Sequence, residues 1–480
     1  MDQVFKMFKE PAAKKSKKMA KLCKMEDNFP VDANNPSLET HKNDKLFIER
    51  FSSLFNAEKL SDIVLAVGDQ RFYAHKFMLI VSSDVFEVMF NEIRWKESSQ
   101  VEVSLTEELE CVAVFPHFLR YIYTGGVSLT TDNVLPILLL ADKYNIPALG
   151  QTCVEYMLHH VVENPDTNRT LSWYQYAKIT ANTLLVDKCR KFILSNFDII
   201  LQTSDWMTLT KAEVCEFLSS NDLVVSDEYY LWMMVDKWFS CDCHQPSSKD
   251  VEDIISLIHF TMIPPKQLLE IEKSCLYLNH KEFFREKLNL AYRHHSLLLD
   301  SVDLKGTEER FRNYTSECYR ICCDLNMSHY LSTEKCQSKI NQRIISSYDF
   351  FSAPSGLSKN NQAEFDITLW PKGPFKTFQW YGKLSDNASL SIRMIPKKQE
   401  HLLIGITFIV YGIKNGVRYV AYSYANKNTF SNTNTLFVED NLMSLKRFNE
   451  ENSPFLISGN LEAKLFLKVE EVIMPEQKTP

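Results

Sequence analysis

The spacing of apolar side chains predicts the elements at the centre of the N-terminal half. Apolar and small residues alternate over 63–67, a Gly-Asp turn follows, and residues 71–73 resume the alternation. This pattern predicts a β-hairpin. After His75 the apolar residues are three or four positions apart, which is typical of a helix. The stretch 60–90 therefore predicts two short strands followed by two helices.

The hydrophobic pattern changes twice further along the chain. Helical spacing dominates from residue 112 to about residue 299 and predicts a series of packed helices. From about Ile344 the period becomes two, and Asn415-Gly416 separates two apolar strands, which is a strong hairpin signal. Many strands without a long helix predict an antiparallel β-sandwich over 343–473. No kelch periodicity is present, so we do not expect a propeller.

Composition narrows the class of protein. The chain has 480 residues, is 45% hydrophobic and carries a net charge of −7. These values predict several globular domains and argue against nucleic acid as a partner. No signal peptide and no apolar run of ~20 residues is evident, so we expect no membrane contact. Without a secretory signal, the twelve cysteines are interpreted as reduced thiols in the cytoplasm or nucleus.

Lysines crowd the stretch 14–24, within a polar N-terminal segment. Residues 1–42 are therefore expected to form a disordered basic tail. A nuclear-localisation signal or a patch for an acidic partner remains the alternative. A short C-terminal tail is expected at 474–480.

Several residues around the predicted hairpin resemble the BTB (POZ) domain family. Asp62 precedes the first strand, and Ala74-His75-Lys76 follows the second, as in that family. The resemblance implies an α/β domain over 43–162. It also implies that Asp62 and His75 are structural, as buried polar groups that support each other.

An apolar stripe precedes this domain's first strand. Phe47, Phe51 and Leu54 share one face of a predicted helix. The stripe could pack on its own domain. The BTB resemblance implies instead that the helix pairs with its twin in a homodimer, with Phe77 near the same interface.

The tripeptide Trp95-Lys96-Glu97 lies between the second helix and the third predicted strand. It resembles the apolar–any–Glu pattern with which BTB adaptors bind the scaffold protein cullin-3. The resemblance implies that Trp95 is an apolar anchor and that Glu97 accepts hydrogen bonds from the partner. The alternative is a tryptophan packed on its own core beside a solvated glutamate.

The helical region resembles the BACK domain, which follows BTB in such adaptors. The matching pieces are Lys191-Phe192-Ile193, Phe217-Leu218 and Val235-Asp236-Lys237-Trp238. We place an all-α BACK domain at 163–300 and a linker at 301–342. The order of the three domains resembles that of BTB–BACK proteins whose C-terminal sandwich is TRAF/MATH-like. The resemblance implies the same kind of sandwich here, so the expected fold class is a multidomain α+β protein.

Few residue patterns in the sequence indicate a metal-binding or catalytic site. Cys241, Cys243 and His244 lie close in sequence, and a second group contains Cys318, Cys322, Cys323, His329 and Cys336. Neither shows the paired spacing of a zinc site, so free thiols are the better interpretation. No phosphate-binding or catalytic motif is present. We expect a non-enzymatic protein with no metal and no cofactor.

Two classes of function follow. In the first, the chain is a substrate adaptor of a cullin-3 ubiquitin ligase, with the sandwich binding an unknown protein substrate. A sandwich can bind a peptide by strand addition at an open edge. In the second, the chain is a scaffolding homodimer with no cullin contact. A transcriptional regulator is a weaker third class, because no zinc-finger pattern is present.

Overall fold

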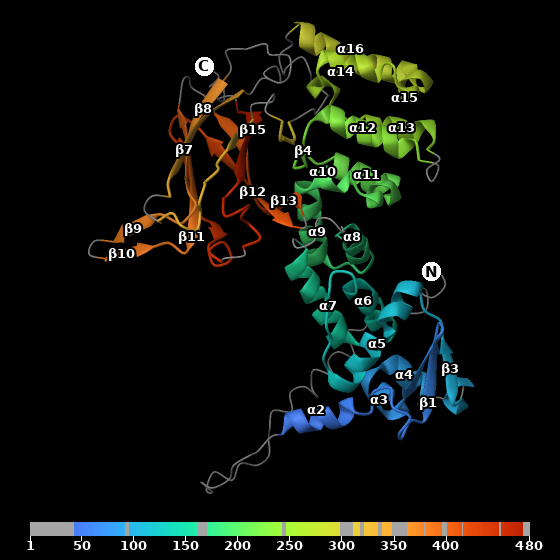
Figure 1. Cartoon of the computed structure of the whole chain (residues 1–480). Coiled ribbons are helices and arrows are strands. Elements are labelled where there is room, and N and C mark those ends of the chain that lie inside the picture. The colour runs from blue at the N-terminus through green and yellow to red at the C-terminus, as the bar shows by residue number, and fades with distance from the viewer. Residues whose placement is uncertain are drawn as a thin grey trace, which may run out of the picture.

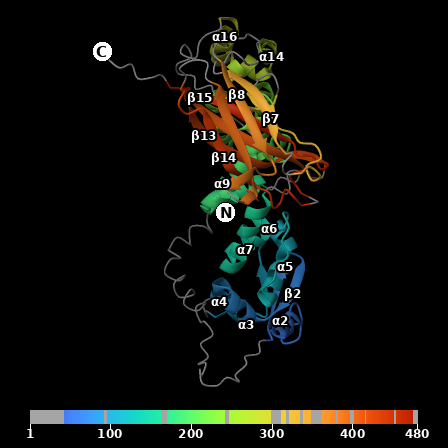
Figure 2. The same ribbon diagram turned by 90° about the vertical axis from the view of Figure 1, so that its left-hand side faces the viewer.

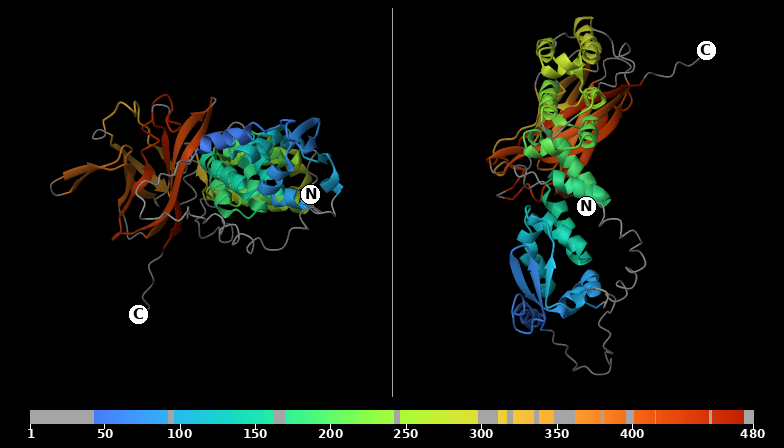
Figure 3. Two further views of the ribbon diagram at one scale, coloured as in Figure 1. Left: turned by 90° about the horizontal axis from the view of Figure 1, so that it is seen from below. Right: turned by 90° about the vertical axis from the view of Figure 1, so that its right-hand side faces the viewer.

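The chain forms an N-terminal α/β domain, a central helical domain and a C-terminal β-sandwich (Figure 1). The helical domain extends away from the α/β domain. The sandwich lies beside the half of the helical domain that is farther from the α/β domain (Figures 1 and 3). This computed structural model describes residues 43–91, 96–161, 170–241, 246–297, 311–316, 321–334, 338–347, 362–378, 381–395, 401–414, 416–450 and 453–473. The expected tails at 1–42 and 474–480 lie outside these residues.

The N-terminal domain contains the predicted hairpin. Strand β1 (Ile63–Val67) pairs antiparallel with β2 (Gln70–Ala74) and parallel with β3 (Glu102–Leu105), in the order β2-β1-β3. The buried alternation of Ile63, Leu65 and Val67 faces the helices. These are α2 (Asp44–Ser52), α3 (Lys76–Ser82), α4 (Asp84–Asn91), the 3₁₀ helix η2 (Lys96–Ser99), α5 (Leu109–Thr124), α6 (Val134–Lys143) and α7 (Pro147–His160).

Local sequence signals set the helix boundaries in this domain. The Ser83 hydroxyl accepts a hydrogen bond from Phe86 N at 3.2 Å at the start of α4, as expected for a serine cap. Gly125 ends α5 with a φ of 66°, which glycine adopts at little cost. Both boundaries therefore depend on residue types at the helix ends themselves.

The central domain is entirely helical apart from the two-residue strand β4 (Val224–Val225) within its described residues. Its core is rich in tryptophan, and the indole of Trp238 donates to Leu209 O at 3.2 Å. The helices are α8 (Thr170–Ile179), α9 (Thr183–Ser195), α10 (Phe197–Ile200), η3 (Ser204–Thr208), α11 (Lys211–Leu218), α12 (Glu228–Phe239), α13 (Ser248–Ile255), η4 (Phe260–Met262), α14 (Pro265–Ile271), α15 (Cys275–Asn279) and α16 (Lys281–Leu297).

The C-terminal part contains two four-stranded antiparallel sheets, consistent with the predicted sandwich (Figure 2). One has the order β13-β12-β15-β6, the other β14-β11-β8-β7, and a hairpin of β9 and β10 projects from them (Figure 1). The strands are β6 (Cys322–Asp324), β7 (Ile340–Ser347), β8 (Gln362–Trp370), β9 (Phe375–Phe378), β10 (Tyr381–Leu384), β11 (Asn387–Ile395), β12 (Leu402–Lys414), β13 (Val417–Phe430), β14 (Leu436–Ser444) and β15 (Ala463–Val472).

The predicted hairpin after β12 is confirmed. Lys414 lies opposite Val417 in the ladder, and Gly416 has a φ of 82°. A two-residue turn of this kind requires positive φ, which explains the glycine. Asn415 lies outside the described residues.

The expected linker at 301–342 is wrong for much of its length. Residues 313–314 form the strand β5 (Asn313–Tyr314), which pairs with β4, and β6 pairs with β15. The sandwich therefore begins well before residue 343. Short strands of two or three residues have too few alternating positions to be recognised by period.

Candidate interaction sites

An apolar surface lies on α2 and α3 of the N-terminal domain. The two helices lie side by side in both Figures 1 and 2. Phe47 is 60% exposed and Phe77 is 67% exposed. Phe51 and Leu54 are partly buried, and Leu54 packs against the core. We call the exposed side chains the α2–α3 surface: Leu46, Phe47, Ile48, Phe77 and Val81.

Asp62 and His75 both contribute hydrogen bonds near the start of α3, but each bonds to different partners. His75 is buried, and its ring contacts the Tyr123 hydroxyl at 2.9 Å and Lys59 O at 3.1 Å. Asp62 is exposed, and its carboxylate accepts a hydrogen bond from Lys76 N at 2.7 Å. The expectation that both are buried and support each other is corrected: they are two separate polar anchors of one helix start.

Only part of the tripeptide Trp95-Lys96-Glu97 lies within the described residues. Glu97 lies in η2 and is partly buried, and its backbone carbonyl accepts from Gln100 N at 3.3 Å. This short helix follows α4, as the sequence placed it. Trp95 lies outside the described residues.

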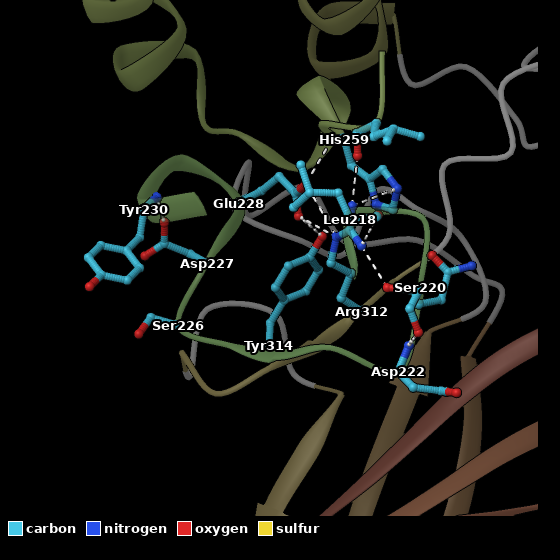
Figure 4. Close-up of polar contacts among 12 residues, drawn as sticks. Leu218, Ser220, Asp222, Ser226, Asp227, Glu228, Tyr230, His259, Arg312 and Tyr314 are labelled. Carbon is cyan, nitrogen blue, oxygen red and sulfur yellow. Dashed lines mark hydrogen bonds and ion pairs between the residues drawn. The ribbon is translucent and has the colours of Figure 1, made fainter. Parts of the chain in front are cut away.

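A buried ion pair lies where the helical domain meets the sandwich (Figure 4). Arg312, from the segment before β5, donates from Nε to Glu228 Oε2 at 3.2 Å, and both side chains are fully buried. Its Nη1 donates to Leu218 O and Ser220 O, each at 2.7 Å, and its Nη2 donates to Leu257 O at 2.7 Å. The guanidinium is therefore bound by three separate parts of the helical domain.

The Glu228 carboxylate also has hydrogen-bond donors other than Arg312. It accepts from the Tyr314 hydroxyl at 2.6 Å and from His259 N at 2.9 Å. Burial by itself would raise the pKa of Glu228, but Arg312 and the nearby His259 outweigh that effect and hold the pKa below its ordinary value. The pair is therefore ionised and hydrogen-bonded on both sides, the arrangement that a buried charge requires.

Backbone pairing joins the same two domains. Strands β4 and β5 are parallel, with Asn313 N donating to Leu223 O at 2.9 Å. The buried Lys468 of β15 donates to Asn221 O at 2.8 Å, and burial lowers its pKa to about 8. The sandwich is thus bonded to the helical domain at several separate points.

Strand β14 lies at one edge of its sheet. Met394 N donates to Thr435 O at 2.8 Å, so the alternate residues Leu436 and Val438 direct their backbone groups away from β11. No further strand pairs with β14 among the described residues. The side chains of both residues are also more than 40% exposed. This edge, residues 436–438, offers alternating donors and acceptors together with apolar side chains.

The cysteines require one correction. Cys111, Cys153, Cys189, Cys215, Cys275, Cys322 and Cys323 are free thiols. Cys241, however, is disulfide-bonded, contrary to the expectation of reduced thiols throughout. Lasting disulfides are typical of oxidising compartments, so cysteine usage no longer favours a reducing one. Within the described part of the chain, no group of three His, Cys, Asp or Glu could hold a metal ion, and no helix could cross a membrane.

Comparison with known families accounts for this architecture. Residues 51–161 match the BTB/POZ domain, residues 170–273 match BACK ("BTB And C-terminal Kelch"), and residues 309–477 match the BTBD17 TRAF domain. The chain carries BTB, BACK and TRAF domains in that order. These are typically non-enzymatic protein-interaction domains, and none of them indicates a catalytic family.

Known proteins match parts of this chain. BTB/POZ domain-containing protein 17 of Xenopus tropicalis is 28% identical, and the match covers 52% of this chain and 53% of the relative. The galectin-3-binding protein of Pongo abelii is 26% identical, covering 74% and 60% respectively. The chain spans between about half and three fifths of the length of these relatives. A solved BTB domain of zebrafish PATZ1 is 22% identical and covers 25% of this chain and 98% of its own, with a TM-score of 0.21.

Sequence reasoning missed the residues that join BACK to TRAF. Arg312 and Glu228 are 84 positions apart, and nothing local indicates that they meet. One weak signal exists, because Arg312 lies between Phe311 and Tyr314, and a cation among core-type aromatics suggests a buried partner. The open edge of the TRAF domain also needed the sheet order, which the sequence did not specify.

Proposed function

We propose that the chain is a non-enzymatic substrate adaptor of a cullin-3 RING ubiquitin ligase. The BTB domain dimerises and docks cullin-3, and the TRAF domain binds a protein substrate. The observation that carries this proposal is the order of the three domains: a docking domain, a helical spacer and a recognition domain. Such an adaptor performs no chemistry and raises the effective concentration of substrate at the ligase. The role requires the chain to meet cullin-3 in the cytoplasm or nucleus, and the Cys241 disulfide, which is of a kind typical of oxidising compartments, is the observation that stands against this location.

Dimerisation uses the α2–α3 surface. Its five exposed apolar side chains belong to two helices that lie next to each other in Figures 1 and 2, and an exposed apolar patch is typical of protein interfaces. A two-fold axis would place the patch against its own copy, which buries the same residues on both subunits. The dimer then presents two TRAF domains to substrate.

Cullin-3 docks on the segment that contains Trp95 and Glu97. Glu97 is partly buried on a short helix at the surface of the BTB domain, where a carboxylate can accept hydrogen bonds from a partner. Trp95 supplies the apolar anchor. Truncation of such an aromatic anchor typically costs at least ~2 kcal/mol of binding free energy.

Calorimetry of the full chain with the cullin-3 N-terminal domain tests the docking step. We expect micromolar or tighter binding for the wild type, weaker binding for Glu97→Ala, and the largest loss for Trp95→Ala. Glu58→Ala is the matched control, because it removes another carboxylate from the BTB domain, at an exposed position far along the sequence from the tripeptide. No heat of binding for the wild type would reject the adaptor role and favour the scaffolding homodimer.

The substrate binds at the β14 edge. An extended peptide can pair with the outward backbone groups of Leu436 and Val438, and their exposed side chains can contact alternate apolar residues of that peptide. Val438→Pro removes one outward donor and leaves the bonds to β11 intact. Phe437→Pro is the contrasting variant, because Phe437 bonds to β11.

Parallel affinity capture with the full chain tests this edge. Proteins retained by the wild type should be lost from Val438→Pro, whose circular dichroism and melting temperature should stay close to those of the wild type. Phe437→Pro should unfold the sandwich. Equal capture by the wild type and Val438→Pro would exclude β14 as the binding edge.

A further inference from the structure

The second edge on this side of the TRAF domain, strand β13, is already occupied. Asn196 follows helix α9 of the BACK domain and lies beside Val420 of β13. Its side-chain oxygen accepts from Val420 N at 2.7 Å, and its side-chain nitrogen donates to Val420 O at 3.2 Å. One amide thus binds both backbone groups of a single residue, as a neighbouring strand would.

The register shows that these backbone groups face outward. Tyr411 lies opposite Val420 and directs its own N–H to Glu462 O at 2.9 Å, on the other side of β12. Opposed residues in an antiparallel pair exchange either two backbone bonds or none. Val420 therefore turns its N–H and C=O away from β12, toward the BACK domain.

A bulge contributes to this geometry. Val410 pairs with Tyr422 and Tyr411 pairs with Val420, so Ala421 is the extra residue on β13. Bulges bend an edge strand and interrupt its ladder. Asn196 and Val420 are both buried, so an unbound amide or carbonyl would be costly at this position.

We propose that Asn196 is a positioning residue: it occupies the β13 edge in place of a strand and, with Arg312, holds the BACK and TRAF domains as one rigid body. The two residues act at separate points, Asn196 on β13 and Arg312 at the parallel pairing of β4 and β5. Of the two edges formed by β13 and β14, the β14 edge is then left for a partner, and its orientation relative to the BACK domain is fixed. The use of that orientation for substrate transfer rests on the proposed function, whereas the rigid junction does not.

Amide hydrogen exchange on the full chain, resolved to single residues by fragmentation mass spectrometry, tests the occupied edge. The Val420 amide should exchange at least about 10-fold more slowly than the Val438 amide, since within the described parts of the chain only the Val420 amide has a partner. Asn196→Leu should accelerate Val420 by at least about 10-fold and leave the core amide of Phe408 unchanged. Asn182→Leu is the matched control, because it removes the N-cap bond at the other end of α9 without contacting β13.

Each outcome decides the proposal. The proposal that Asn196 occupies the β13 edge would be overturned if, in the wild type, the Val420 amide exchanged as fast as the Val438 amide. It would also be overturned if Asn196→Leu did not accelerate exchange at Val420. Small-angle X-ray scattering then tests rigidity under conditions in which circular dichroism shows the helices intact: Asn196→Leu combined with Arg312→Met should increase the maximum dimension, and an unchanged profile would overturn the rigid body. Neither measurement involves cullin-3 or a substrate, so both stand whatever the calorimetry gives.

Discussion

Replacing Arg312 by methionine should strongly destabilise the BACK domain. Methionine keeps much of the aliphatic volume but removes the charge, so Glu228 remains buried without its cation, and three backbone carbonyls lose their donors. Breaking a buried ion pair from one side typically costs about 3–5 kcal/mol of unfolding free energy. We expect a loss in that range at neutral pH.

Urea unfolding of the full chain, followed by tryptophan fluorescence, measures this loss. Four of the seven tryptophans lie in the BACK domain, so the signal reports mainly on that domain; they are Trp173, Trp206, Trp232 and Trp238. Arg343→Met is the matched control, because its ion pair with Asp366 lies on the sandwich surface. Exposed pairs contribute little, so this variant should unfold with the wild type.

A second variant separates charge from packing. Glu228→Gln in the Arg312→Met background removes the unpaired charge, while the amide oxygen can still accept from His259 N. The double variant should therefore be more stable than Arg312→Met alone. If Arg312→Met unfolds no more readily than Arg343→Met, the ion pair does not hold the junction and this reasoning fails.

Acid should reduce the difference between the wild type and Arg312→Met. The folded-state pKa of Glu228 lies below its ordinary 4.5. The stability that this group contributes is therefore present above pH 4.5 and lost as the pH falls through the folded pKa. The two unfolding free energies should converge in that acidic range.

Three further predictions concern single residues. Phe47→Asp should convert a dimer into a folded monomer by light scattering, because Phe47 is exposed on the α2–α3 surface; a monomeric wild type would contradict the dimer. His75→Ala should cost about 1–3 kcal/mol because it leaves a buried hydroxyl without its ring partner, and thermal melting should show a smaller loss for the exposed Asp62→Ala. Lys468, whose pKa is lowered to about 8, should make the folded state more stable as the pH rises from 8 toward the ordinary lysine pKa; Lys468→Met should abolish this rise, as measured by melting temperature between pH 7 and 10.

The sequence was most informative where a signal is local. The hairpin of β1 and β2 and the hairpin of β12 and β13 each depend on a few adjacent residues. The period of two located the longer strands of the TRAF domain, and the family resemblance supplied the domain order. These features can be read without knowledge of distant contacts.

Contacts between distant segments were not accessible in this way. Asn196 and Val420 are 224 positions apart, and asparagine at a helix end is commonplace as a local cap. The sequence also could not show that Asp62 is exposed, because the family pattern specifies residue type rather than depth. The start of the TRAF domain was missed because β5 and β6 are too short to show a period.

The position of Arg312 has a consequence for how this protein could have arisen by recombination of domains. The residue lies within the matched TRAF region, yet its side chain completes the core of the BACK domain. An exchange that replaced everything after the last BACK helix would leave Glu228 buried without a cation. If the exchanged segment began instead at the longer strands of the TRAF domain, β6 would not be transferred with it and β15 would lose its pairing with β6. The two domains can be inherited or transplanted without damage only as a pair, and their sequence boundary is not a boundary between independent folding units.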